Sequence, residues 1–295
     1  MCLCAGHTKE CMVYLQKAFG SALSGSPEYE QFYIIFGKAT RNGKTSLIDT
    51  VARIFGDYAV TAQPQTLSRR SSNGAAPSPD LARLHGARFI SIPEPEKDMP
   101  LNSALIKQFT GGDTFVGRFL SENPFEFKVL GKIFYNTNHL PPIKDDTILT
   151  SGRVKVIPFN RHFNEDEQDK GLKQLFQHKG IKSAVLNWLL KGYEEIQKNG
   201  FDTPPRIEEA TAEYHSTTII VKKFLNENTR VETNSVIKTS KLYEQYTIWA
   251  INNDFPTMKN TDFVQALREL CDVRRHNNGR VVKGLTVLDI DELFA

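Results

Sequence analysis

The chain has 295 residues, of which 40% are hydrophobic and 24% are charged, and its formal net charge is +3 at pH 7. This is the composition of a globular protein of one large or two ordinary domains, whose core needs neither disulfides nor metal. No apolar run reaches the ~18 residues that span a bilayer, and the N-terminus lacks the layout of a signal peptide. We therefore expect a soluble, intracellular protein, and any contact with nucleic acid must come from a local basic patch.

The four cysteines are Cys2, Cys4, Cys11 and Cys271. With His7, the first three form a Cys-x-Cys-x2-His-x3-Cys cluster of residue types that can bind zinc. A Cys-x-Cys pair is a cramped bite for one metal ion, and no second pair follows it. We favour a frayed end with free thiols and expect no metal there.

The stretch from Phe32 to Thr50 organises the chain. After a predicted helix over residues 8–24, an apolar run suited to a strand covers residues 32–36, and a polar loop then ends in Gly-Lys-Thr before a helical pattern. Backbone N–H groups in such a loop, together with the positive end of the following helix, form a site for phosphate groups. The order of strand, loop and helix predicts an NTP-binding site.

Within this loop each residue type has a role. Gly43 lets the backbone approach the phosphates, Lys44 supplies a positive charge, and the Thr45 hydroxyl can bind magnesium. Five residues separate Gly37 from Gly43, whereas the usual spacing is four. The alternative is a turn that binds nothing. The predicted nucleotide-binding residues are Gly37, Thr40, Asn42, Gly43, Lys44, Thr45 and Ser46.

A second predicted strand, at residues 87–92, is followed by Glu94 and Glu96. In P-loop ATPases this is where carboxylates hold magnesium and polarise the attacking water. Alternation in an extended segment would direct both side chains to the same place. We expect Glu94 to help hold magnesium with Thr45 and both glutamates to be catalytic. The alternative is a surface turn with two solvated glutamates.

Two later strands also end or begin with polar residues. Asn138, with Asn136 as second choice, follows a buried strand pattern at 132–137 and is expected to contact the γ-phosphate or the attacking water. Arg153 precedes another strand and is predicted to stabilise charge on the transferred phosphoryl group, from its own subunit or from a neighbour. A surface ion pair is the alternative for Arg153, and Arg161 is the substitute candidate.

Between these elements the pattern predicts a helix at 102–109 and a hairpin with strands near 115–120 and 125–129. Farther along, residues 165–199 and 206–228 are mostly helical. Two more helices and a terminal hairpin follow from about residue 231, which suggests a winged helix. Residues 268–283 hold five Arg or Lys and two acids, so the local charge is +3. That patch suits DNA phosphates through Arg274, Arg275 and Arg280, although a protein-docking surface is equally favoured.

Five motifs in one order resemble the superfamily 3 helicase domain, above all that of phage and plasmid primase-helicases, with poxvirus NTPase-primases as more distant kin. The motifs are GKATRNGKTS, RFISIPEPE, LIKQFTGGDTFVGRFL-SENPFEFK, FYNTNHLPPI and SGRVKVIPF. The resemblance implies an α/β fold: a P-loop AAA+ core with a central parallel sheet, an N-terminal helical segment and a C-terminal winged-helix-like domain. The expected boundaries are 1–30, 31–205 and 206–295.

The resemblance also implies an activity. Such proteins hydrolyse ATP with Mg2+ at the subunit interfaces of a homo-oligomeric ring, usually a hexamer, and translocate on single-stranded or forked DNA. Carried over by motif, the catalytic residues are Lys44, Glu94, Glu96, Asn138 and a trans-acting Arg153. The family's DNA-translocating hairpin corresponds to residues 115–129, where Arg118 and Lys128 are the expected DNA contacts. Its tip, Ser-Glu-Asn-Pro, departs from the family because it lacks a basic residue.

The resulting hypothesis is a DNA helicase that unwinds DNA during replication of a phage, plasmid or other mobile element in the host cytoplasm. A primase or other replication proteins are candidate partners, and no membrane contact is expected. No primase motif precedes the ATPase motifs, so we expect no primer synthesis, whether the chain is a fragment or a helicase-only relative. Two alternatives stay open: an ATPase that loads or remodels DNA complexes without strand separation, and a non-hydrolysing DNA-binding assembly module.

Overall fold

The computed structural model describes residues 9–68, 79–96, 99–141, 143, 148, 151–169, 171–253, 255, 257–276 and 279–288. The chain forms two compact units. One comprises Met1–Leu140 and Thr147–Thr211, and the other comprises Pro141–Asp146 and Ala212–Ala295. Among the described residues, no helix is long and apolar enough to cross a membrane.

The first unit is built on a five-stranded sheet in the order β2-β3-β6-β1-β7, in which every neighbouring pair is parallel. Parallel sheets are buried on both faces, which is why β1 and β6 have continuous apolar runs rather than alternation. This sheet confirms the predicted α/β core. The strands are β1 (Phe32–Phe36), β2 (Ala59–Thr61), β3 (Phe89–Ile92), β6 (Lys132–Thr137) and β7 (Val154–Pro158).

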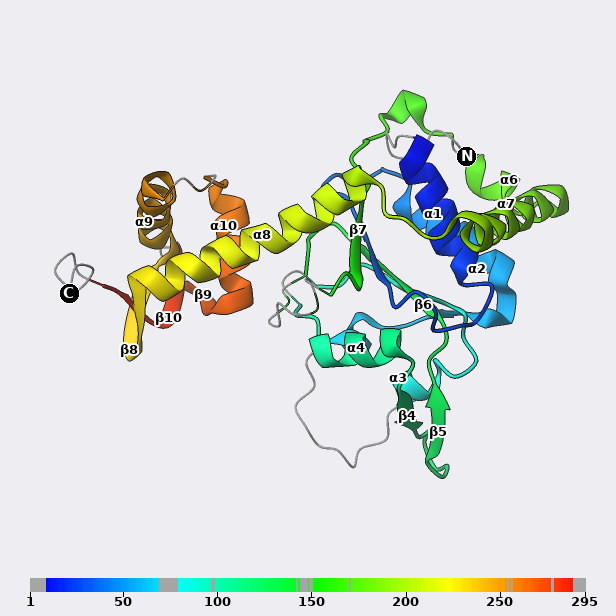
Figure 1. Cartoon of the computed structure of the whole chain (residues 1–295), viewed down its shortest axis with the longest axis horizontal. Coiled ribbons are helices and arrows are strands. Elements are labelled where there is room, and N and C mark those ends of the chain that lie inside the picture. Colours follow the sequence, from blue (N-terminus) through cyan, green and yellow to red (C-terminus); the bar gives the residue numbers. More distant parts are fainter. Residues whose placement is uncertain are drawn as a thin grey trace. The chain divides into compact units, whose positions relative to one another are not determined.

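Three helices pack on one face of this sheet: α1 (Lys9–Ser21), α2 (Lys44–Phe55) and α7 (Lys179–Asn199) (Figure 1). Their buried apolar side chains share one core with side chains from β1, β3 and β6. The helix predicted at 8–24 is therefore confirmed, three residues shorter at its C-terminal end. Shorter elements complete the unit: η1 (Gly56–Tyr58), η2 (Pro64–Leu67), α3 (Pro79–Ala82), η3 (Glu165–Glu167) and α6 (Leu172–Leu175).

The centre of this core is aromatic. Phe134 is fully buried, and its ring lies 5.0 Å from that of Tyr33, 4.8 Å from that of Phe89 and 4.7 Å from that of Phe19. Aromatic pairs at these separations add to the free energy of burial. Two neighbouring strands and a covering helix therefore depend on one side chain.

We expect Phe134→Ala to lower the free energy of unfolding by about 3–5 kcal/mol, since it removes a buried ring and leaves a cavity. Denaturant titration followed by fluorescence measures this loss. The matched control is Val116→Ala, because Val116 is 60% exposed and its removal should change stability by less than about 0.5 kcal/mol. An equal effect of the two substitutions would contradict the described core.

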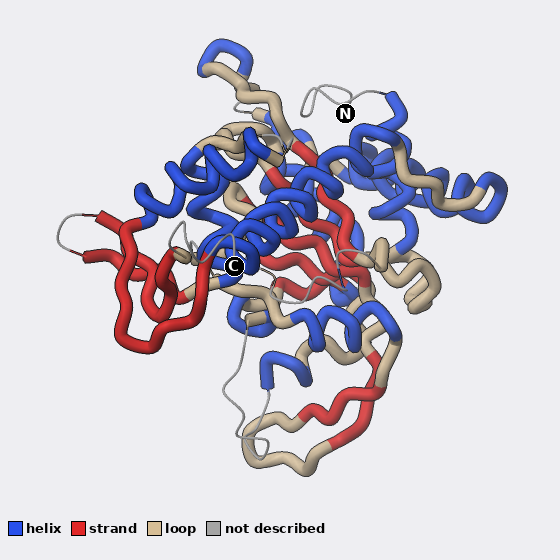
Figure 2. Tube along the Cα trace, turned by 60° about the vertical axis from the view of Figure 1, so that its left-hand side comes forward, coloured by secondary structure: helices blue, strands red, loops and turns tan. Residues whose placement is uncertain are grey.

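Helix α4 (Ser103–Gly111) leads into a hairpin of β4 (Thr114–Gly117) and β5 (Phe125–Lys128). The Asn102 side chain caps α4 by accepting hydrogen bonds from two backbone N–H groups. Figures 1 and 2 show the hairpin projecting away from the central sheet. The predicted helix and hairpin are confirmed, with strands shorter than expected and a longer connection at residues 118–124.

Helix α8 (Pro205–Asn228) carries the chain from the first unit into the second. The second unit holds an antiparallel sheet in the order β8-β10-β9 and a core that α8, α9 and α10 share. The predicted helices and hairpin are confirmed, and the winged-helix assignment stays a prediction. The elements are β8 (Thr229–Lys238), α9 (Thr239–Asn252), α10 (Asn260–Leu270), β9 (Asp272–His276) and β10 (Gly279–Val287).

Strand β8 was not predicted from the sequence. Most of its residues are exposed, Val231 by 85%, and only Ile237 is buried, so it lacks the alternation that marks a half-buried strand. Its extended form comes from pairing with β10, which is a contact between distant parts of the chain. Strand formation there is a tertiary effect.

Candidate functional site

The loop between β1 and α2 lies at the carboxyl edge of the sheet, where β1 is flanked by β6 and β7. Ligands of open parallel sheets bind at this edge. Gly37 has no room for a side chain, because an added Cβ would collide with the Phe159 carbonyl oxygen and the Asn42 side chain. Gly43 has φ 83°, a left-handed conformation that suits glycine, and directly precedes α2. Both glycines are thus required by the loop's shape.

A later segment that sequence reasoning missed holds this loop in place. After β7 ends, the Phe159 N–H donates to the Phe36 carbonyl at 2.5 Å, and the Phe163 N–H donates to the Arg41 carbonyl at 3.0 Å. The His162 ring donates from Nδ1 to the Thr40 carbonyl at 2.8 Å, since a carbonyl can only accept. Arg41 has φ 54°, and these bonds flank it. The segment 159–163 therefore supports the strained part of the loop.

Asn42 is one of the predicted nucleotide-binding residues, and its side chain faces the protein. It is buried, and its Nδ2 donates to the Ala39 carbonyl at 2.6 Å and to the Phe159 carbonyl at 3.4 Å. Its place in the loop is structural, so any contact with a nucleotide would be through its backbone. Nothing in the residue pattern separates this role from a side-chain contact.

Lys44 and Asn138 meet in the middle of the candidate site. The Lys44 ammonium donates to the Asn138 carbonyl oxygen (Oδ1) at 2.6 Å and to the Gly37 carbonyl at 3.0 Å. Lys44 is 4% exposed, and this burial lowers its pKa to about 8, while the nearby Glu94 carboxylate acts in the opposite direction. A buried cation at a helix N-terminus is well placed to receive phosphate oxygens.

Thr45 and Asn136 form the neighbouring part of the site. The exposed Thr45 hydroxyl accepts a hydrogen bond from Asn136 Nδ2 at 3.3 Å. Asn136 is 9% exposed, and its buried Oδ1 has no hydrogen-bond partner among the described residues. With Glu94 nearby, these groups offer the hard oxygen ligands that magnesium prefers, either directly or through its waters. The donor set therefore fits Mg2+, and Asn136 is closer to this centre than its second-choice status suggested.

Glu94 and Glu96 both follow β3 and are exposed. Glu94 is close enough to Lys44 for its charge to act on the pKa of the ammonium. Within the described part of the chain, Glu96 makes no hydrogen bond or ion pair with Lys44 or Thr45. The structure thus brings Glu94 to the site and leaves the role of Glu96 a prediction.

Arg153 lies at the amino ends of the strands, whereas the phosphate loop lies at their carboxyl ends. Strand β7 begins at Val154, opposite Phe32, and ends at Pro158, opposite Phe36, so five residue steps, about 16 Å of strand, separate Arg153 from the level where the phosphate loop begins. Its guanidinium pairs with Glu30 at 2.5 Å and not with a residue of the loop. This geometry excludes a contact between Arg153 and a nucleotide bound to its own Lys44. Of the three possibilities, action within its own subunit is thus excluded, the predicted ion pair is present with Glu30, and action on a neighbouring subunit stays a prediction.

Arg161, the substitute candidate, lies beside the loop. Its guanidinium pairs with Glu167 at 2.8 Å and sits 4.5 Å above the Phe163 ring. The hydrogen bond from the Asn164 backbone, which is the largest cause, and the neighbouring Arg161 guanidinium lower the pKa of the Glu167 carboxyl. Arg161 is therefore engaged in a local ion pair.

The predicted DNA contacts on the hairpin are exposed. Arg118 donates from Nε to the Glu122 carbonyl at 3.1 Å, which turns it toward the tip, and Lys128 lies on β5 opposite Thr114. The other predicted contacts are in the second unit, where Arg274 forms an ion pair with Asp272 at 2.9 Å. Arg275 and Arg280 face each other across β9 and β10. Like charges in such cross-strand positions repel unless an anion lies between them.

A search of the described residues finds no group of three or more His, Cys, Asp or Glu arranged to bind a metal ion. Cys11 is buried in α1. The other members of the predicted N-terminal cluster, Cys2, Cys4 and His7, lie outside the described residues. The prediction of no metal at this cluster stays a prediction.

Comparison with known proteins finds relatives in viruses. The chain is 29% identical over 262 residues to a protein of Acanthamoeba polyphaga mimivirus named "Putative helicase", covering 83% of this chain and 27% of that protein. It is 27% identical over 257 residues to a protein of Frog virus 3 with the same designation, covering 81% of this chain and 26% of that protein. The chain thus spans about a quarter of the length of these relatives.

No family model matches the chain. Among solved structures, the apo C-terminal region of NrS-1 aligns with 97% of this chain and 78% of its own length, at 13% identity and a TM-score of 0.48. The chain is therefore related, over most of its length, to viral proteins whose names read "Putative helicase".

Proposed function

We propose that this chain is the motor part of an ATP-dependent DNA helicase of superfamily 3, which assembles as a homo-oligomeric ring, by resemblance a hexamer. The observation that carries the proposal is the convergence of a Gly-Lys-Thr loop, Asn138 and Asn136 at one edge of a parallel sheet. Sequence similarity to viral proteins whose names read "Putative helicase" supports the same function. Viral replication proteins are the context in which we expect it to act.

The residues at this edge have separable roles in binding ATP. Backbone N–H groups of residues 38–43 and the first turn of α2 receive the phosphates, and Lys44 exchanges its contact with the Gly37 carbonyl for a phosphate oxygen. Thr45, Asn136 and Glu94 would hold Mg2+, which neutralises charge on the phosphates when bound. The Asn138 side chain, which already accepts a hydrogen bond from Lys44, then lies next to the γ-phosphate. Its hydrogen bonds can therefore differ between the states with and without that phosphate.

Hydrolysis requires a base-like group for the attacking water and a cation for the transition state. Glu94 is our candidate to orient the water, with Glu96 as its partner, and Arg153 of an adjacent copy supplies the cation. Lys44 and Arg153 lie at opposite ends of the strands in one chain. A head-to-tail arrangement therefore brings the Lys44 of one copy next to the Arg153 of another. Repeated contacts of this kind close into a ring or extend as a filament.

DNA would be bound by the hairpin through Arg118 and Lys128 and by the facing Arg275 and Arg280 of the second unit. Phosphate groups are the anions that would relieve the repulsion between that arginine pair. The hairpin tip carries no basic residue, which favours one alternative: an ATPase that remodels or loads DNA complexes without separating strands. Unwinding of a labelled forked duplex distinguishes the two functions.

The first test is steady-state ATP hydrolysis by the wild type and Lys44→Ala, with and without single-stranded DNA, over a wide range of protein concentration. We expect DNA to stimulate turnover, and specific activity to rise with concentration because the site needs two copies. Lys44→Ala should be inactive, since it removes the charge that binds the phosphates. Nucleotide binding without hydrolysis at any concentration or with any DNA would refute the motor function and leave a non-hydrolysing assembly module.

A further inference from the structure

Three hydrogen-bond acceptors hold Arg153 at the amino ends of the strands, away from the phosphate loop. Its Nη2 donates to the Glu30 carboxylate at 2.5 Å, and its Nη1 donates to the Thr110 hydroxyl at 2.8 Å and to the Lys107 carbonyl at 3.4 Å. A free arginine side chain loses about 2 kcal/mol of rotamer entropy when it is fixed. In this protein most of that ordering is complete before any nucleotide arrives.

The Thr110 hydroxyl is well suited to this task. It is 6% exposed and donates its own proton to the Ile106 carbonyl at 2.8 Å, so its oxygen is left to accept from Arg153. Thr110 also lies in the last turn of α4, where the carbonyl end of the helix favours a cation. The contact is therefore directional and electrostatically favourable.

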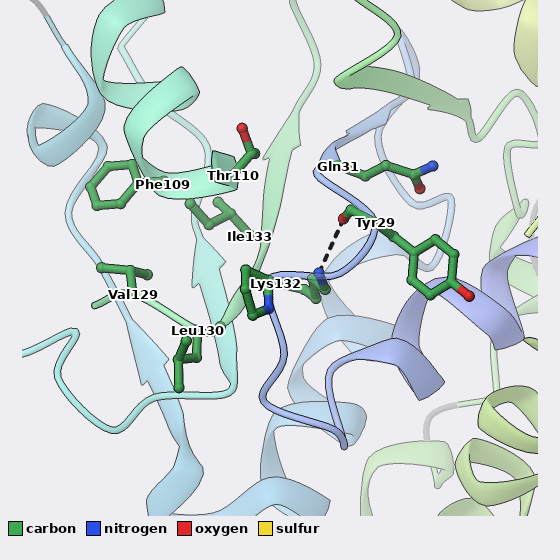
Figure 3. Close-up of a pocket in the computed structure, with 10 residues that line it drawn as sticks. Tyr29, Gln31, Phe109, Thr110, Val129, Leu130, Lys132 and Ile133 are labelled. Carbon is green, nitrogen blue, oxygen red and sulfur yellow. Dashed lines mark hydrogen bonds between the residues drawn. The ribbon is translucent and has the colours of Figure 1, made fainter. Parts of the chain in front are cut away.

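Glu30 is set in place by a buried lysine. The Lys132 ammonium, on a residue only 5% exposed, donates to the backbone carbonyl of Glu28 at 2.5 Å. It also donates to the backbone carbonyl of Tyr29 at 3.0 Å (Figure 3). The cavity beside it, lined by the same loop, the end of α4 and the start of β6, is about 10 Å3 and has room for one water at most. The loop that carries Glu30 is thus fixed by packing and by Lys132, and the cavity that it lines among the described residues is too small for a ligand.

We call the three acceptors of the Arg153 guanidinium, in Glu30, Thr110 and Lys107, the clamp. The clamp leaves part of the guanidinium available to other partners. Of its five N–H donors, the three described contacts use three, which leaves Nε and one hydrogen of Nη2. The Arg153 side chain is 23% exposed, so part of it is accessible from outside the chain. An arginine oriented in this way needs no reorganisation when charge develops on a phosphoryl group.

We propose that Thr110 and Glu30 are positioning residues that orient Arg153 toward the nucleotide of an adjacent copy. This inference rests on the proposed function, because it assigns the residues that serve the same interface. Their contribution belongs to the transition state, since Arg153 acts on charge that develops during transfer. Loss of the clamp therefore lowers kcat and leaves KM unchanged.

The experiment compares Thr110→Val, which keeps the shape and removes the hydroxyl, with Thr110→Ser, which keeps the hydroxyl. We expect Thr110→Val to lower kcat about tenfold at unchanged KM, as for loss of a hydrogen bond to a charged group, and Thr110→Ser to retain near wild-type kcat. Glu30→Ala should show the same pattern as Thr110→Val. The matched control is Glu28→Ala, which removes an acid from the same loop that does not pair with Arg153 among the described residues.

A double-mutant cycle separates positioning from general damage. In an Arg153→Ala background, measured under single-turnover conditions, Thr110→Val should have no further effect, because it acts only through Arg153. Wild-type kcat for Thr110→Val, or a tenfold loss that persists without Arg153, would overturn the clamp while leaving the ATPase intact. A wild type that does not hydrolyse ATP would instead overturn the proposed function, and the clamp with it.

Discussion

Mixing two inactive variants, Lys44→Ala and Arg153→Ala, is expected to restore ATP hydrolysis. Alone, each should lose activity by about a thousandfold, because one lacks the phosphate-binding cation and the other the arginine that stabilises the transition state. In a mixed assembly, the Arg153→Ala copy contributes an intact Lys44 and the Lys44→Ala copy an intact Arg153. Random association in equal amounts makes about one interface in four complete, so activity should approach a quarter of the wild-type value.

The expectation follows from the distance between the two residues in one chain. Lys44 lies beyond the carboxyl end of β1, and Arg153 precedes the first residue of the neighbouring β7. The control mixes Lys44→Ala with the double variant Lys44→Ala/Arg153→Ala, which cannot form a complete site and should stay inactive. Activity in Arg153→Ala alone close to that of the wild type, or no recovery in a mixture shown to co-assemble, would contradict a site shared between copies.

The contrast between Lys44 and Arg153 also shows which parts of the candidate site can be predicted from the sequence. The phosphate loop is local: strand, glycines, lysine and helix are consecutive, so their pattern alone predicts their geometry. The chemistry around Arg153 is not local, because Glu30, Thr110 and Arg153 come from three distant segments. No periodicity or motif records that they meet. The residue pattern therefore left open whether Arg153 acts in its own subunit, in a neighbour or in a surface ion pair, and only the family resemblance implied action on a neighbour.

Other differences have the same cause. Asn136 and Asn138 are two residues apart, and pattern alone ranked Asn138 first, whereas the structure brings Asn138 to Lys44 and Asn136 to Thr45. The segment 159–163 begins with the last residue of the SGRVKVIPF motif and contains the candidate Arg161, yet no pattern predicts that its hydrogen bonds support the phosphate loop. Strand β8 becomes extended only through β10. In each case long-range pairing decides what short-range pattern leaves undetermined.

Nucleotide affinity should depend on pH through Lys44. Burial lowers the pKa of this lysine to about 8 in the free protein, whereas phosphate groups bound next to the ammonium favour its charged form. Below pH 8 the lysine is already charged and affinity should be constant. Above pH 8, binding must take up a proton, so the affinity for ADP or a non-hydrolysable ATP analogue should fall by up to about tenfold per pH unit.

Calorimetric titrations between pH 7 and 9.5, in buffers of different ionisation enthalpy, measure both the affinity and the proton uptake. Lys44→Arg is the matched control, because arginine stays charged over this range and its binding should lack the decline above pH 8. Affinity that is flat for wild-type Lys44 would mean that the ammonium is not buried as described.

Unfolding cannot mimic this result, since its pH dependence has the opposite sign. The pKa of Lys44 is about 8 in the folded state and that of an unfolded lysine is 10.5, so between these values the unfolded chain binds more protons. Stability contributed by this group therefore rises with pH while nucleotide affinity falls. Stability and affinity change in opposite directions with pH because burial and phosphate have opposite effects on the Lys44 pKa. Burial in the free protein favours the neutral amine, whereas a bound phosphate favours the charged ammonium.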